Sequence, residues 1–132
     1  MPSGVHSVSV SVLDIRLATS RIGADSYVVA LAGEFDLHAS EGVRARLSEV
    51  LEAGARSVVV DLIGVTLLDS AALGVLISTA KTLQSSGGEL ILVIDDRRVL
   101  RTLEIAGAQP FFDIRPSLME AVQDVIDRRL AV

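Results

Sequence analysis

Residues 57–76 read SVVVDLIGVTLLDSAALGVL, and this stretch decides the fold. Its first part, residues 57–62, is an apolar run rich in β-branched side chains, which is typical of a strand covered on both faces. From residue 70 onward apolar side chains recur at helical spacing, and the pattern predicts a helix over residues 70–86. An acidic residue and a hydroxyl, Asp69 and Ser70, therefore stand at a predicted junction between strand and helix.

Strand and helix patterns alternate through the rest of the chain. We predict strands at residues 8–17, 27–33, 57–62, 89–94 and 111–114, and helices at residues 38–53, 70–86, 96–106 and 116–130. The alternation in the first strand changes phase, so we expect a bulge or a register change near Val12. Strands that alternate with helices imply crossover connections. The predicted fold is α/β, a mixed sheet of four to five strands covered by about four helices.

The chain has 132 residues, half of them hydrophobic and only 3% aromatic. That length suggests a single domain over residues 1–132, and we expect residues 1–7 to be partly frayed. A domain of this size buries roughly two thirds of its unfolded surface, which is enough for a core without crosslinks. The core must be aliphatic because aromatic side chains are so few.

Composition excludes several classes of function. The absence of cysteine excludes disulfides, thiolate catalysis and cysteine metal sites, and it fits a cytoplasmic protein. The net charge of −5 repels phosphate backbones and anionic lipid, so we expect neither nucleic acid nor a membrane as partner. His6 and His38 lack metal-ligand spacing, and no glycine-rich loop precedes a helix to hold a phosphate. We therefore expect no cofactor and no metal.

Two motifs at a fixed order along the chain point to a known family. The turn Gly33-Glu34-Phe35-Asp36 precedes the first predicted helix. The strand that ends in VDL is followed, seven residues on, by Asp-Ser and then by Leu-Gly-Val-Leu. Over about residues 8–128 these motifs and the order of elements resemble the STAS domain family, and within it the bacterial anti-sigma factor antagonists.

The resemblance implies a regulator and no enzyme. A family antagonist with an unmodified serine binds an anti-sigma factor that is also an ATP-dependent serine kinase, and this frees a sigma factor. Phosphorylation of the serine breaks the complex, and a protein phosphatase restores it. The resemblance also implies a STAS-like sheet, and it leaves a monomer and a homodimer equally open. By position the phosphorylated residue is Ser70, and the implied partner-binding residues are Asp36, Asp69, Ala71, Ala72 and Gly74.

The motif differs from the common family pattern at two positions. Family members commonly have Asp-Ser-Ser-Gly-Leu-Gly, whereas this chain has Asp-Ser-Ala-Ala-Leu-Gly. Ala71 removes the second hydroxyl, which leaves Ser70 as the serine of the motif. Ala72 replaces a glycine in the first helical turn, which favours the helix by about 1 kcal/mol. We expect its methyl group to limit the approach of a partner backbone.

The chemistry of the motif can be argued without the family. A serine at a helix N-terminus lies among free N–H groups at the positive end of the helix dipole, a good place for a phosphate. Phosphoserine adds about −1.5 to −2 charges at pH 7. Beside Asp69, and beside Asp36 if the fold brings its turn alongside, that charge makes the surface strongly negative. A partner matched to the unmodified surface is then repelled.

Other interpretations remain open. On local grounds alone, Asp36 and Asp69 cap helices and Ser70 fills a first turn. A structural STAS subunit of a signalling complex, or a transporter accessory, is the main alternative function, and the Ala71-Ala72 pair favours it slightly. Asp61 resembles a receiver phosphoacceptor, and Asp61 with Asp69 suggests a carboxylate enzyme, but the accompanying acidic pair, lysine or base is missing. We expect Thr66 to serve in a turn or cap, and Arg97, Arg98 and Arg101 to form a solvated helix face.

Overall fold

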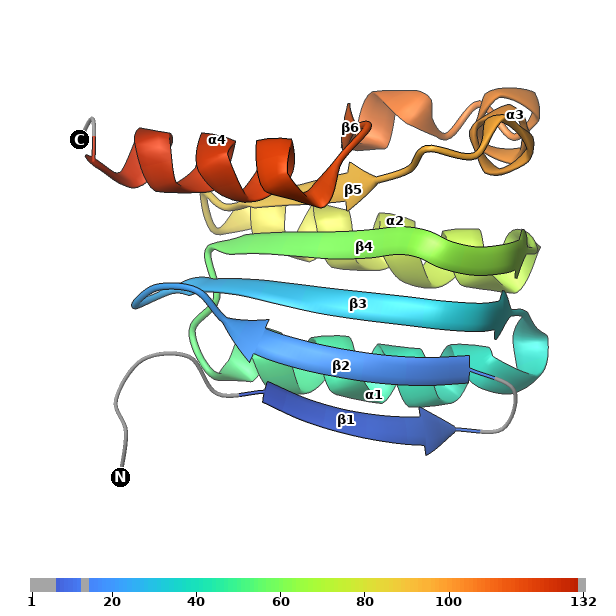
Figure 1. Ribbon diagram of the computed structural model, residues 1–132, viewed down its shortest axis with the longest axis horizontal. Helices are drawn as coiled ribbons and strands as arrows, with labels where there is room; N and C mark the ends of the chain where they lie inside the picture. The colour runs from blue at the N-terminus through green and yellow to red at the C-terminus, as the bar shows by residue number, and fades with distance from the viewer. Residues whose placement is uncertain (1–6, 13–14, 131–132) are drawn as a thin grey trace.

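The computed structural model describes the backbone of residues 7–12 and 15–130. Among these residues, six strands form one sheet and four α-helices pack on it (Figure 1). The elements follow in the order β1 (Ser7–Val12), β2 (Ile15–Arg21), β3 (Ser26–Phe35), α1 (Leu37–Glu52), β4 (Ser57–Leu68), α2 (Ser70–Ser85), β5 (Glu89–Val93), α3 (Arg97–Ile105), a short 3₁₀ helix (Gln109–Phe111), β6 (Asp113–Arg115) and α4 (Leu118–Leu130).

The strands lie side by side in chain order, from β1 at one edge to β6 at the other. β1, β2 and β3 pair antiparallel, whereas β3, β4, β5 and β6 pair parallel. The parallel pairs require crossover connections, and α1, α2 and α3 supply them. The predicted α/β fold with a mixed sheet and four covering helices is confirmed.

The first predicted strand is two strands in the structure. β1 and β2 form an antiparallel pair in which Val12 lies opposite Ile15, so the change of phase in the sequence marks a reversal of the chain. Residues 13–14 lie outside the described residues, as do residues 1–6, for which we expected fraying. Irregular pairing does occur in the sheet, but between β3 and β4, at residues 30–34 of β3.

Helices cover both faces of the sheet. In Figure 1, α1 and α2 lie behind the strands and α4 crosses in front of them. The larger core lies on the α1–α2 side and includes Phe35, Leu47 and Leu76, each at most 1% exposed. A smaller core on the other side joins the sheet to α4 through Ala121 and Val125. Both cores are almost wholly aliphatic, as the composition predicts.

β4 is twice as long as the predicted strand and extends past β5. β5 pairs with residues 57–61 of β4, whereas residues 64–68 of β4 continue alongside β3. As a result β3 and β4 end together at one edge of the sheet, and α1 and α2 begin there side by side (Figure 1). This edge holds the residues that the sequence singled out.

Candidate functional site

The edge is built from two neighbouring strand-to-helix turns with the same design. Glu34 and Phe35 at the end of β3 lie opposite Leu67 and Leu68 at the end of β4. One residue, an aspartate in each case, separates each strand from its helix. The parallel register thus places the beginnings of α1 and α2 next to each other.

Both aspartates cap their helices. The Ala39 N–H donates to Asp36 Oδ1 at 3.1 Å, and the Ala72 N–H donates to Asp69 Oδ1 at 3.0 Å. Asp36 and Asp69 have extended backbone angles, as N-cap residues do. The local prediction that these residues are caps is confirmed, and it is compatible with an additional role in binding.

The Asp69 carboxylate also reaches the other helix. The Leu37 N–H, at the start of α1, donates to Asp69 Oδ2 at 2.9 Å. The Asp69 N–H in turn donates to the Phe35 carbonyl oxygen at 3.3 Å. The two turns are therefore joined by hydrogen bonds in both directions. No sequence pattern predicts this, because Leu37 and Asp69 are 32 positions apart.

Ser70 is the first residue of α2, and it is exposed. It lies directly after the capping carboxylate, where the first N–H groups of the helix have no acceptor within the helix. An exposed hydroxyl at a helix N-terminus is accessible to a kinase, and the helix dipole favours the negative charge that phosphorylation adds. The position therefore has the accessibility and the electrostatics that a phosphorylation site needs.

The other three residues singled out on α2 differ in exposure. Ala71 is half-buried, and Gly74 is exposed, with open space where a Cβ would stand. Ala72 is fully buried at 0% exposure and belongs to the larger core. Its methyl group therefore packs inward, and our expectation that it limits a partner's approach is wrong for this conformation.

Two apolar side chains that the sequence analysis missed lie on the same edge. Leu37, the first residue of α1, is 66% exposed, and Leu67, near the end of β4, is 41% exposed. Ile63, further back along β4, is 42% exposed. Such side chains close to one another on a surface are typical of a protein-binding patch. The available signal was that Leu37 falls outside the apolar stripe of Val43, Leu47 and Val50 on α1.

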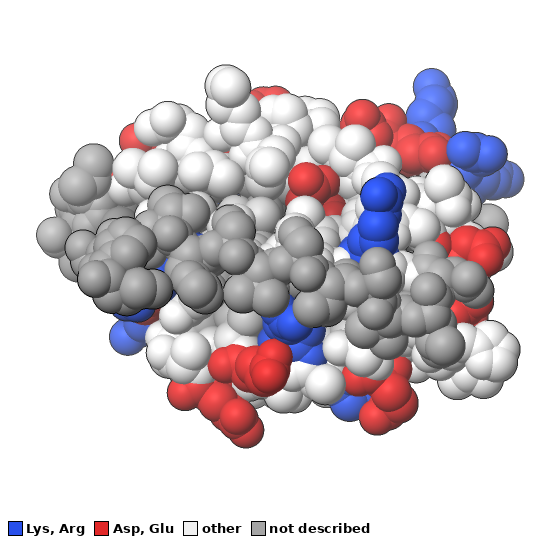
Figure 2. All heavy atoms as spheres, turned by 60° about the horizontal axis from the view of Figure 1, so that its bottom comes forward, with Lys and Arg blue, Asp and Glu red and all other residues white. Residues whose placement is uncertain are grey.

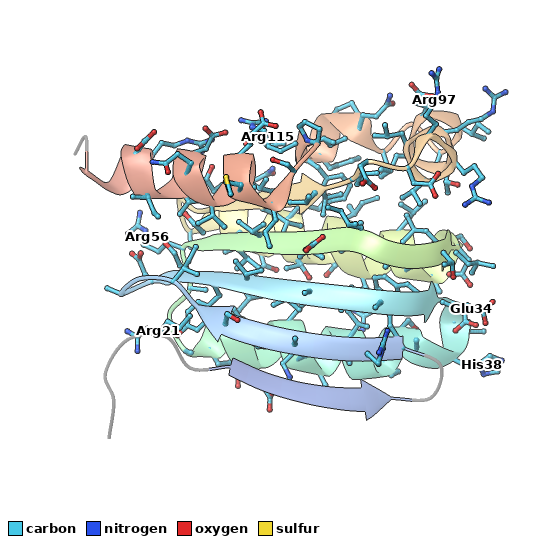
Figure 3. The ribbon with its side chains drawn as sticks, viewed as in Figure 1. Arg21, Glu34, His38, Arg56, Arg97 and Arg115 are labelled. Carbon is cyan, nitrogen blue, oxygen red and sulfur yellow. The ribbon has the colours of Figure 1, made fainter. Side chains whose placement is uncertain are left out.

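Charged side chains surround this edge. Figure 3 places Glu34 and His38 at the end of the molecule where α1 begins, and Arg97 on α3 at the same end. Arg97, Arg98 and Arg101 are exposed, as predicted for a solvated helix face. Arg98 pairs with Asp96 at 3.0 Å, and the hydrogen bonds from Arg98 hold the pKa of the Asp96 carboxyl below its ordinary value. On the face that Figure 2 shows, acidic and basic side chains are interspersed.

The alternative sites lie elsewhere or lack partners. Asp61 accepts a hydrogen bond from the Ile63 N–H at 3.0 Å, and it alternates along β4 with Val60 and Leu62, which face the larger core. Asp61 therefore points to the face of the sheet opposite α2. The Thr66 hydroxyl is exposed on β4 and donates to the Gly33 carbonyl oxygen at 3.4 Å, so Thr66 is a strand residue rather than a cap.

Searches for two further features gave negative results within the described part of the chain. No group of three or more His, Cys, Asp or Glu side chains is placed to hold a metal ion. None of the helices in that part has the length and apolar character needed to cross a bilayer.

The STAS domain model matches residues 18–121, which include every element from β3 to α3 and the turns around Asp36 and Asp69. The chain belongs to the STAS domain family. The anti-sigma-B factor antagonist of Bacillus subtilis (strain 168) is 33% identical over 95 residues, which cover 72% of this chain and 86% of that protein. The family that the sequence motifs suggested is thus confirmed.

A solved STAS structure, the anti-sigma factor antagonist SpoIIAA in its unphosphorylated form, superimposes with a TM-score of 0.71 at 20% identity. The match covers 88% of this chain and 97% of SpoIIAA. The phosphorylated form of SpoIIAA, from Bacillus, gives a TM-score of 0.67 at 21% identity, with 83% of this chain and 98% of that chain covered. At these identities the superpositions establish a shared fold.

Proposed function

We propose that this STAS domain is an anti-sigma factor antagonist that acts by reversible protein binding. In its unmodified form it binds an anti-sigma factor through the edge where α1 and α2 begin, and the sigma factor is released. The observation that carries the proposal is the exposed Ser70 hydroxyl beside the capping Asp69, in a chain whose curated relative is an anti-sigma-B factor antagonist. The protein does its work by occupying a partner, so it needs no catalytic residues of its own.

The proposed contact surface surrounds Ser70. Leu37 and Leu67 supply exposed apolar area, the kind of contact that carries most of the binding energy in small interfaces. Ala71 and Gly74 on α2 present little side-chain bulk, so a partner can approach the helix closely. Asp36 and Asp69 form the acidic rim, and their charges complement a partner with basic residues at the matching positions.

Phosphorylation of Ser70 switches the surface off in this proposal. The Ser70 Oγ bonds to the γ-phosphorus of ATP, the bond from that phosphorus to the bridging oxygen breaks, and ADP leaves. The hydroxyl proton passes to a base of the kinase. The phosphoserine carries about −1.5 to −2 charges at pH 7, next to Asp69. A phosphatase that hydrolyses the ester restores the binding surface.

The electrostatic effect is large enough to act as a switch without refolding the domain. Like charges brought together across an interface cost several kcal/mol. Each 1.4 kcal/mol changes an affinity tenfold. A phosphate on Ser70 therefore lowers a micromolar affinity below any useful value.

The test combines phosphorylation with a matched hydroxyl control. The chain is incubated with ATP and the anti-sigma factor kinase from the same genome, and modified residues are mapped by mass spectrometry for the wild type, Ser70→Ala and Thr66→Val. We expect phosphate on Ser70 in the wild type and in Thr66→Val, and none in Ser70→Ala. Phosphate on Thr66 would show that the neighbouring strand hydroxyl is the target.

A second outcome would favour the alternative function. If the bound partner has no kinase activity and Ser70 is never modified in cells, the domain is a structural STAS subunit of a larger assembly. The proposed switch would then be wrong, although the edge at α1 and α2 would remain a binding surface.

A further inference from the structure

One carboxylate holds the beginnings of two helices at once. We propose that Asp69 is a positioning residue, which fixes the amino end of α1, and with it the exposed Leu37 side chain, beside Ser70. The inference rests on the proposed function in that Leu37 is taken as a contact for the partner. Asp69 then serves binding through the placement of Leu37, in addition to its own charge.

The hydrogen bonds divide the work between the two aspartates. Asp36 caps α1 through the Ala39 N–H, at 3.1 Å, but the Leu37 N–H, the first of the helix, has no acceptor within α1. It donates across to Asp69 Oδ2 at 2.9 Å, while Asp69 Oδ1 accepts from the Ala72 N–H at 3.0 Å. Each oxygen of the Asp69 carboxylate thus serves a different helix.

The geometry links the apolar contact to the switch residue through a single side chain. Leu37 carries the Asp69 hydrogen bond on its own N–H, and Ser70 follows Asp69 directly in the chain. The Leu37 side chain is 66% exposed, so few packing contacts fix it in place. Its position depends instead on its backbone, and therefore on the Asp69 carboxylate.

Asparagine substitutions separate positioning from charge. Asn has one acceptor oxygen and a donor NH₂ group, so it accepts from one N–H in this geometry where Asp accepts from two. Asp36→Asn keeps the one bond that Asp36 makes, because Asn caps helices as well as Asp does. Asp69→Asn keeps the local cap to Ala72 and loses the bond to Leu37. Both variants remove one negative charge from the same edge.

Amide hydrogen exchange measures the Leu37 hydrogen bond without any partner. In Asp69→Asn we expect the Leu37 N–H to exchange about tenfold or more faster than in the wild type, as the loss of a hydrogen bond to a charged group implies. In Asp36→Asn the Leu37 rate should stay within about twofold. Asp69→Ser, which caps α2 but is too short to reach α1, should match Asp69→Asn. Unchanged Leu37 exchange in both Asp69 variants would overturn the proposal.

A double-mutant cycle tests whether Asp69 acts on binding through Leu37. We expect Asp69→Asn to weaken binding to the anti-sigma factor more than Asp36→Asn does, by about tenfold. In a Leu37→Ala background the extra loss from Asp69→Asn should disappear. An equal loss with and without Leu37 would show that Asp69 contributes only through direct contact, and would overturn the positioning role. A wild type that binds no anti-sigma factor would refute the proposed function alone, and the exchange measurement would then decide the positioning role.

Discussion

Ser70 places a single hydroxyl where two electrostatic effects oppose each other. The N-terminus of α2 favours an added negative charge on this residue, whereas Asp69 and Asp36 make the edge around it acidic. The helix therefore tolerates the phosphate, and the interface does not. The sequence could predict this residue and its cap because both lie within one short motif, but the hydrogen bond from Leu37 to Asp69 joins distant positions and needed the structure.

Gly74→Ala separates stability from binding at the residue scale. Gly74 lies within α2, and a Cβ there meets open space, so alanine should stabilise the domain by about 0.5–1 kcal/mol. The same methyl group projects from the proposed contact surface, so we expect weaker partner binding. Urea unfolding and calorimetric titration measure the two effects. Unchanged affinity would place Gly74 outside the interface.

At the scale of elements, the paired turns after β3 and β4 create the site. Their positions depend on β4 continuing past β5, a feature that sequence periodicity did not predict because residues 63–68 mix exposed and buried side chains without strict alternation. The β1–β2 hairpin was missed for a similar reason, since a reversal of the chain and a bulge both change the phase of an alternating pattern. The helices were predicted to within two residues at each end, because their caps and stripes are local signals.

The cap at the start of α1 gives a stability prediction for an element. Asp36→Ala removes the acceptor for the Ala39 N–H, and we expect the free energy of unfolding to fall by about 1 kcal/mol. Asp36→Asn keeps an acceptor oxygen and should fall by much less. Chemical denaturation of both variants checks this. Equal losses would mean that the charge of Asp36, rather than its hydrogen bond, stabilises α1.

Close packing between β3 and β4 gives a second prediction. A Cβ on Gly64 would lie 2.8 Å from the Ala32 Cβ and 3.2 Å from the Leu31 carbonyl oxygen, closer than real contacts allow. Gly64→Ala should therefore destabilise the domain by roughly 1–3 kcal/mol. Adding Ala32→Gly removes the nearest atom, so the double variant should recover part of that loss beyond the sum of the single effects. Purely additive losses, measured by thermal unfolding, would contradict the proposed clash.

At the scale of the whole molecule, a rigid aliphatic core supports an exposed switch. The core spans the sheet, α1, α2 and α3, and its fully buried members include Phe35 and Leu76, which lie close in sequence to Asp36 and Ser70. Composition and periodicity predicted the aliphatic core and the α/β class, because burial patterns are averaged over many residues. Which edge carries the function could be predicted only through the family motif, since several strands end in polar turns.

The affinity of the domain for its anti-sigma factor, with and without phosphate on Ser70, tests the account most directly. Homogeneous phosphoserine-70 protein and unmodified protein are titrated into the same partner by calorimetry. We predict that the phosphate weakens binding at least about a hundredfold, while circular dichroism shows the fold unchanged. Equal affinities for the two forms would contradict the switch at Ser70.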